Sequence, residues 1–139
     1  MIVDSSVLIS ILNSEEEALF FSGVLYAARE RLLAAPTFLE AGIIVDARRD
    51  PVRSRRFDGL LNAAGIEIVP FSFQQARIAR EAYRDFGKGS GHPAQLNFGD
   101  CFSYALAKDL DLPLLYKGDD FSKTDVRSAS DACSANTRS

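Results

Sequence analysis

The sequence predicts a single α/β domain built on a mainly parallel sheet. Short apolar segments alternate with segments whose apolar residues recur at helical spacing, so a helix connects each strand to the next. The chain has 139 residues, 47% of them hydrophobic, which is enough for one compact core. Ligands of such sheets bind outside the carboxyl ends of the strands. Residues that follow the strands are therefore the candidates for a functional site.

The predicted strands are short and apolar, as expected where both faces of a sheet are covered. They comprise residues 1–3, 32–36, 66–70 and 113–116.

Helices are predicted between the strands from apolar spacing and from capping residues at their starts. Three pairs have capping-box spacing: Ser14 with Glu17, Thr37 with Glu40, and Asn97 with Asp100. The glycine-rich segment 87–93 is expected to be a loop. The helices are expected over about 5–12, 18–28, 37–48, 51–64 and 72–86, with a further helix capped by Asn97.

The ends of the chain suggest one domain without a membrane anchor. Residues 1–126 are expected to form the domain, and the polar residues 127–139 a flexible tail. The amino-terminal segment has no basic region, and no apolar run is long enough to cross a bilayer. Cys101 and Cys133 have no partners at metal-ligand spacing, so neither a zinc site nor a disulfide framework is expected. A soluble protein of the reducing cytoplasm is the simplest interpretation.

Charge and histidine content limit the possible chemistry. The formal net charge of −3 provides no general attraction to nucleic acid, so a polyanionic substrate would need a local basic patch or bound cations. The chain has one histidine, His92, so a nuclease mechanism with two imidazoles is excluded. His92 lies in the glycine-rich loop as either an exposed turn residue or a substrate contact.

Acidic residues follow the strands at the edge where a ligand would bind. Asp4 comes directly after the first strand, Glu40 soon after the second, and Asp119-Asp120 after the fourth. Asp100 lies in the first turn of the helix before the fourth strand, and the sequence alone does not show at which edge of the sheet that helix starts. Glu40 and Asp100 could each be explained by helix capping alone. Asp4 is harder to explain in that way, and the joint pattern favours a site.

Converging carboxylates repel one another unless a cation or a proton offsets their charge. Carboxylate oxygens without Cys or His are the ligands that suit Mg²⁺ or Mn²⁺ rather than Zn²⁺. A metal-assisted reaction at phosphorus is therefore expected.

Four blocks of sequence resemble one known family. MIVDSSVLISIL, TFLEAG, NFGDCFSYALA and LLYKGDDFSKTD, which span most of the chain in this order, closely resemble the PIN-domain toxins of the VapC type. The resemblance implies a three-layer α/β/α sandwich, an endoribonuclease dependent on Mg²⁺ or Mn²⁺ that acts as the toxin of a toxin–antitoxin pair, and a VapB-like antitoxin as partner.

The resemblance also implies roles for individual residues. Asp4, Glu40 and Asp100 match the family's first three acids, all of them catalytic metal ligands. Asp119 is favoured as the fourth, with its neighbour Asp120 in support. Ser6 matches a small hydroxyl residue that supports the site.

Two surface features suggest partners beyond the metal. Five arginines lie between residues 48 and 56, either as a solvated helix surface or as a rim for RNA phosphates. The helix at 18–28 is apolar on more than one side, which favours contact with a second copy, in a homodimer, or with the antitoxin over ordinary core packing.

Two alternative functions stay open. A phosphoaspartate-type phosphotransfer domain also has acids at strand ends, but its expected second acid near Asp4 is replaced by Ser5 and Ser6. A catalytically silent PIN-like binding module would keep the fold and lose acids.

Overall fold

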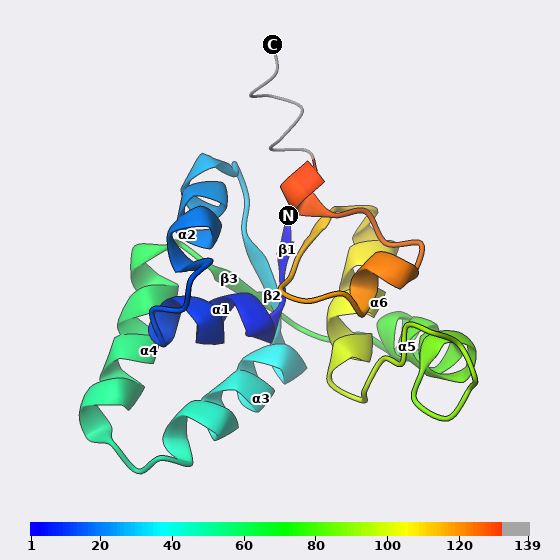
Figure 1. The fold of residues 1–139 in the computed structure, drawn as a ribbon, viewed down its shortest axis with the longest axis horizontal. Helices are drawn as coiled ribbons and strands as arrows, with labels where there is room; N and C mark the ends of the chain where they lie inside the picture. Colours follow the sequence, from blue (N-terminus) through cyan, green and yellow to red (C-terminus); the bar gives the residue numbers. More distant parts are fainter. Residues whose placement is uncertain (132–139) are drawn as a thin grey trace.

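The computed structural model describes residues 1–131, which form a sheet of four parallel strands between two groups of helices (Figure 1). The strand order is β3-β2-β1-β4, so the first strand lies inside the sheet. The strands are β1 (Ile2–Val3), β2 (Leu32–Ala34), β3 (Glu67–Val69) and β4 (Leu114–Leu115). The predicted parallel sheet is confirmed, with strands shorter than their apolar segments.

Helices cover both faces of the sheet, as predicted. They are α1 (Ser5–Leu12), α2 (Ala18–Ala27), α3 (Ala35–Asp46), α4 (Pro51–Ala63), α5 (Phe73–Phe86) and α6 (Asp100–Leu110), with a 3-10 helix, η1, at Phe121–Lys123. Helices α1 to α4 lie on one side and α5 and α6 on the other (Figure 1).

Alternate strand residues point into two separate hydrophobic cores. Val3, Leu33 and Leu115 pack against α1 to α4, whereas Ile2, Leu32 and Leu114 pack against α5 and α6. The expected three-layer α/β/α sandwich is therefore confirmed.

Two predicted capping boxes are not formed. Helix α3 begins at Ala35, before Thr37, because Pro36 suits the first turn of a helix. The Thr37 hydroxyl is buried and has no hydrogen-bond partner. Ser14 has a positive φ of 51°, and α2 begins only at Ala18 without a side-chain cap. Ser72 with Gln75 does form a capping box at the start of α5.

Residues 127–131 are packed against the domain, although the sequence suggested that a tail starts there. The Leu114 N–H donates to the Arg127 carbonyl at 2.8 Å, and Ala129 is buried in the core. The fold therefore extends beyond the expected boundary at residue 126. The rest of the expected tail, including Cys133, lies outside the described residues. Within residues 1–131, no helix has the length and apolarity needed to cross a bilayer.

Candidate active site

Asp4 is fixed at the carboxyl end of β1 by hydrogen bonds to both carboxylate oxygens. Oδ2 accepts from the Ser6 hydroxyl at 2.6 Å and from the Ser6 N–H at 3.1 Å, which makes Asp4 the N-cap of α1. Oδ1 accepts from the Ser103 hydroxyl of α6 at 2.6 Å. Asp4 is only 3% exposed, and short hydrogen bonds from hydroxyl groups hold its carboxylate in place. The position of this carboxylate is therefore set by two helices.

Ser103 was not identified from the sequence. It is fully buried on α6, three residues after Asp100, so both side chains lie on the same side of the helix. That spacing was the available signal, but a buried serine in an apolar helix has no distinctive pattern of its own. Ser6, which was expected to support the site, also accepts a hydrogen bond from the Lys117 N–H at 3.0 Å, linking α1 to the segment after β4.

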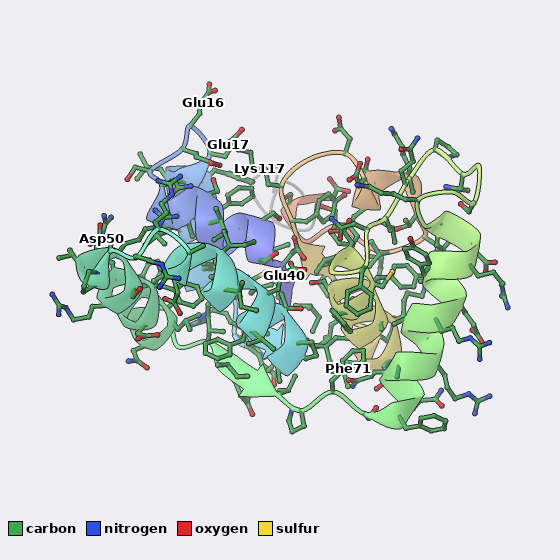
Figure 2. All side chains as sticks on the ribbon, turned by 90° about the horizontal axis from the view of Figure 1, so that it is seen from below. Glu16, Glu17, Glu40, Asp50, Phe71 and Lys117 are labelled. Atoms are coloured by element: carbon green, nitrogen blue, oxygen red, sulfur yellow. The ribbon has the colours of Figure 1, made fainter. Side chains whose placement is uncertain are left out.

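Glu40 lies in the second turn of α3 and is not part of a capping box. Its Oε1 accepts from the Ser5 hydroxyl at 3.1 Å, and its carboxyl group lies against Gly99, just before α6. Figure 2 labels Glu40 in the space between α1 and α6. The pKa of Glu40 is raised above its usual value, chiefly by burial. The Ser5 hydrogen bond lowers this pKa, and the charge of Asp4 raises it. Capping therefore does not explain this acid.

Asp100 does take part in a reciprocal capping arrangement. Its Oδ2 accepts from the Asn97 N–H at 3.0 Å, and the Asn97 Oδ1 accepts from the Asp100 N–H at 2.8 Å. The helix α6 runs antiparallel to β4, which follows it, so the start of α6 lies at the same sheet edge as Asp4. The capping interpretation is correct for these two hydrogen bonds. Asp100 also lies close enough to the other acids to interact with their charges.

Electrostatic interactions join Asp100 to three other carboxylates. Burial raises the pKa of Asp100 to about 6; the Asn97 N–H lowers it, and the charges of Asp4, Asp120 and Glu40 each raise it. We call Asp4, Glu40, Asp100 and Asp120 the acidic cluster. An acid whose pKa is raised by burial and by three neighbouring carboxylates marks a candidate functional site.

This raised pKa predicts how pH affects the metal-free protein. The pKa of Asp100 in the folded protein lies above the ordinary value of about 3.9, so the folded protein binds this proton more tightly than the unfolded chain does. The resulting stabilisation is fully present below about pH 4 and is lost as the pH rises through about 6. We expect the melting temperature of the wild type to fall relative to that of Asp100→Asn over this interval. Thermal melts of both proteins in metal-free buffers test this, and parallel pH profiles would show that Asp100 titrates normally.

Asp119 and Asp120 differ in their relation to the cluster. Both are exposed and precede η1, but Asp120 is the one whose charge acts on Asp100. The backbone carbonyl of Asp119 accepts a hydrogen bond from the Ser122 hydroxyl.

Lys117 points away from the acids. Its amine pairs with Glu15 at 2.6 Å and with Glu17 at 3.4 Å, in the segment between α1 and α2 (Figure 2). A phosphoaspartate-type site would need a lysine beside its acids, so these ion pairs argue against that alternative.

The side chains of the cluster fit a Mg²⁺ or Mn²⁺ ion in donor type and charge. All are carboxylates, and Asp4 Oδ1, Glu40 Oε1 and Asp100 Oδ2 each accept one hydrogen bond and so keep a second lone pair. Within residues 1–131, however, no three carboxylate, thiol or imidazole groups converge closely enough to bind one ion directly. Mg²⁺ keeps several waters in its coordination shell, and these suit a cluster of this looser kind.

The arginines at 48–56 lie away from the acidic cluster. Arg53 donates to the Asn13 side chain at 2.6 Å, and Arg56 donates to the Leu12 carbonyl at 3.5 Å, so both are held at the end of α1. Figure 2 shows Asp50, which lies among these arginines in the sequence, at the outer end of α3 and α4, far from Glu40. A phosphate rim here would contact RNA at a distance from the acids.

His92 contacts its own loop and a neighbouring helix. Its Nδ1 accepts from the Ala94 N–H at 3.1 Å, and its ring packs edge-on against Phe86 at a centroid distance of 4.9 Å. These contacts favour the structural interpretation of His92.

Apolar side chains are exposed on α2 and beside the acidic cluster. On α2, Leu19 is 88% exposed and Tyr26 66%, while Phe21 and Leu25 are buried, so the helix is apolar on two sides as expected. A second apolar surface is a groove of about 340 Å³ between α3 and the start of α6. This groove is lined by Pro36, Leu39, Glu40, Ile43, Ile44, Phe98 and Phe102.

Comparisons with known proteins agree on one family. The profile of the PIN domain matches residues 1–127. A VapC ribonuclease of Mycobacterium bovis and ribonuclease VapC28 of Mycobacterium tuberculosis are each 53% identical over 131 residues, which cover 94% of this chain and 98% of theirs. Ribonuclease VapC42 of Mycobacterium tuberculosis is 44% identical over 129 residues, 93% of this chain and 98% of that protein.

Solved structures share the fold at low sequence identity. The structure of Mycobacterium tuberculosis VapC20, described as a sarcin-ricin loop cleaving toxin, aligns with a TM-score of 0.71 at 12% identity and covers 90% of this chain and 95% of that one. A toxin–antitoxin complex from Klebsiella pneumoniae aligns with a TM-score of 0.65 at 16% identity, covering 87% and 89%.

Proposed function

Because this chain belongs to the VapC group of the PIN-domain family, we propose that it is an endoribonuclease dependent on Mg²⁺ or Mn²⁺ and acts in the cytoplasm as the toxin of a toxin–antitoxin pair. The observation that carries the proposal is the coupling of Asp4, Glu40 and Asp120 to Asp100 at the edge of the sheet where ligands bind. All these acids are present, which argues against a catalytically silent module.

In the proposed mechanism, Asp4, Glu40 and Asp100 would hold a hydrated metal ion, in part through the waters of its coordination shell. A bound Mg²⁺ or Mn²⁺ would supply an activated water and would offset negative charge on the phosphate. Ser6 and Ser103 hold the Asp4 carboxylate, Ser5 holds Glu40, and the Asn97 N–H holds Asp100. These second contacts fix where the ligand oxygens lie, as they do in other metal sites.

The fourth acid is proposed to be Asp120, with Asp119 as the alternative favoured by the family resemblance. Support comes from the effect of Asp120 on the pKa of Asp100. Its exposed carboxylate could accept a proton from the attacking water or help to hold a second ion.

The proposed partners are single-stranded RNA, a VapB-like antitoxin and a second copy of the chain. The groove beside Glu40 supports the antitoxin, because an apolar segment bound there would cover the acidic cluster. The exposed apolar residues of α2 support a homodimer contact. The arginines at 48–56 are proposed to contact RNA phosphates outside the cleavage site.

Hydrolysis by water makes a specific prediction about the products. Water attacks the phosphorus and the 3′-oxygen leaves, so one product carries a 5′-phosphate with an oxygen from water and the other a 3′-hydroxyl. Single-turnover cleavage in H₂¹⁸O, followed by mass spectrometry, should therefore find one ¹⁸O in the 5′-phosphate. A 2′,3′-cyclic phosphate without ¹⁸O would mean that the ribose hydroxyl attacks, and the proposed mechanism would be wrong.

A further inference from the structure

Residue 99 is a glycine whose backbone conformation does not require one. Gly99 has φ −64° and ψ −37°, in the right-handed helical region that every L residue adopts readily. Glycine in that region gives up conformational entropy that alanine would not. The reason for a glycine at this buried position is therefore in its surroundings.

Those surroundings are the carboxyl group of Glu40. A β-carbon on residue 99 would lie 2.5 Å from the Glu40 Cδ and 2.8 Å from Oε1, and closer still to Oε2. All three distances are far below van der Waals contact, so an alanine side chain and this carboxylate cannot occupy their positions together. The lack of a side chain lets Glu40 reach across from α3 to the backbone beside Asp100.

Other helical glycines in the described chain do not share this feature. A β-carbon on Gly23, Gly42 or Gly59 would meet no atom within 4 Å apart from its chain neighbours and the backbone of its own helix. Gly59 lies in the middle of α4, on the outside of the molecule, and so provides a matched control for adding one methyl group to a helical backbone.

We propose that Gly99 is a positioning residue of the acidic cluster, which by having no side chain admits the Glu40 carboxylate to the metal site. The inference rests on the proposed function. Because the group in conflict is the far end of a flexible side chain, a methyl group at residue 99 displaces the Glu40 carboxylate and leaves the fold intact. Substitution here thus separates metal binding from stability.

The test is the Gly99→Ala variant, compared with the wild type and with Gly59→Ala. Calorimetric titration with Mn²⁺ measures the affinity, and thermal melts in metal-free buffer measure stability. For Gly99→Ala we expect Mn²⁺ affinity at least about tenfold weaker, as for other disturbed metal sites, with a melting temperature equal to or above that of the wild type. For Gly59→Ala we expect unchanged affinity.

A double variant tests whether Gly99 acts through Glu40. In a Glu40→Ala background the displaced carboxylate is already gone, so adding Gly99→Ala should change the remaining Mn²⁺ affinity, measured at millimolar Mn²⁺, less than about twofold. A further tenfold loss in that background would overturn the inference, as would wild-type affinity in Gly99→Ala alone or a lower metal-free melting temperature. If the wild type itself binds no Mn²⁺, the proposed function fails together with the inference. If the wild type binds Mn²⁺ and Gly99→Ala binds it equally well, only the inference about Gly99 fails.

Discussion

Replacing Asp100 with Asn is expected to reduce RNA cleavage more than about 100-fold, because even the residues that support a metal site contribute roughly 10- to 100-fold. The amide oxygen can still accept the hydrogen bond from the Asn97 N–H, so the start of α6 keeps its cap. Removing one charge also relieves repulsion from Asp4, Asp120 and Glu40. The metal-free melting temperature should therefore equal or exceed that of the wild type, while the stabilisation by Mg²⁺ is lost.

Glu40→Gln and Asp4→Asn are expected to show the same loss of cleavage. Gln keeps an oxygen for the Ser5 hydroxyl, so Glu40→Gln should fold normally. Asp4→Asn weakens two short hydrogen bonds from Ser6 and Ser103 at a buried position, so some loss of stability is expected there. Cleavage assays and melts on the three variants check this. Wild-type cleavage rates with earlier melting for Asp100→Asn and Glu40→Gln would show that these acids are structural only.

The same assays distinguish Asp119 from Asp120. Asp120→Asn should reduce cleavage about 10- to 100-fold, whereas Asp119→Asn should stay within about threefold of the wild type. The reverse result would restore Asp119 as the fourth acid.

The layers of the fold could be predicted from the sequence because each strand is a short apolar run and each helix has its own apolar spacing. The strand lengths could not, since residues such as Tyr116 extend an apolar run without joining the ladder. Capping boxes predicted from spacing were correct at Asn97 and wrong at Thr37 and Ser14. The i to i+3 spacing of such a pair does not show whether the helix has already begun, as α3 has at Ala35 with Pro36 in its first turn.

Within the site, the sequence indicated which acids follow the strands but left Asp100 unplaced. The helix that leads into a parallel strand runs antiparallel to it, so its start lies at the carboxyl edge, and this rule could have placed Asp100. The contacts of Ser5 and Ser103 and the close approach at Gly99 could not be predicted. They depend on how α1, α3 and α6 pack together, which no local pattern records.

Removal of the metal is expected to have an effect as large as removal of an acid. The carboxylates of the cluster repel one another, and a divalent ion that binds only the folded protein offsets this repulsion. At an ion concentration about 100 times the dissociation constant, binding stabilises the fold by about 2.7 kcal/mol, which corresponds to several degrees in melting temperature. Mg²⁺ or Mn²⁺ should therefore both activate and stabilise the protein.

The most direct test of the central claim is cleavage of a labelled single-stranded RNA with and without excess chelator, using an Asp100→Asn preparation to exclude contaminating nuclease. The account predicts that the chelator stops cleavage by the wild type, that added Mg²⁺ or Mn²⁺ restores it, and that Asp100→Asn stays inactive throughout. Undiminished cleavage by the wild type in excess chelator, with no cleavage by Asp100→Asn, would contradict the claim that the acidic cluster works through a bound metal.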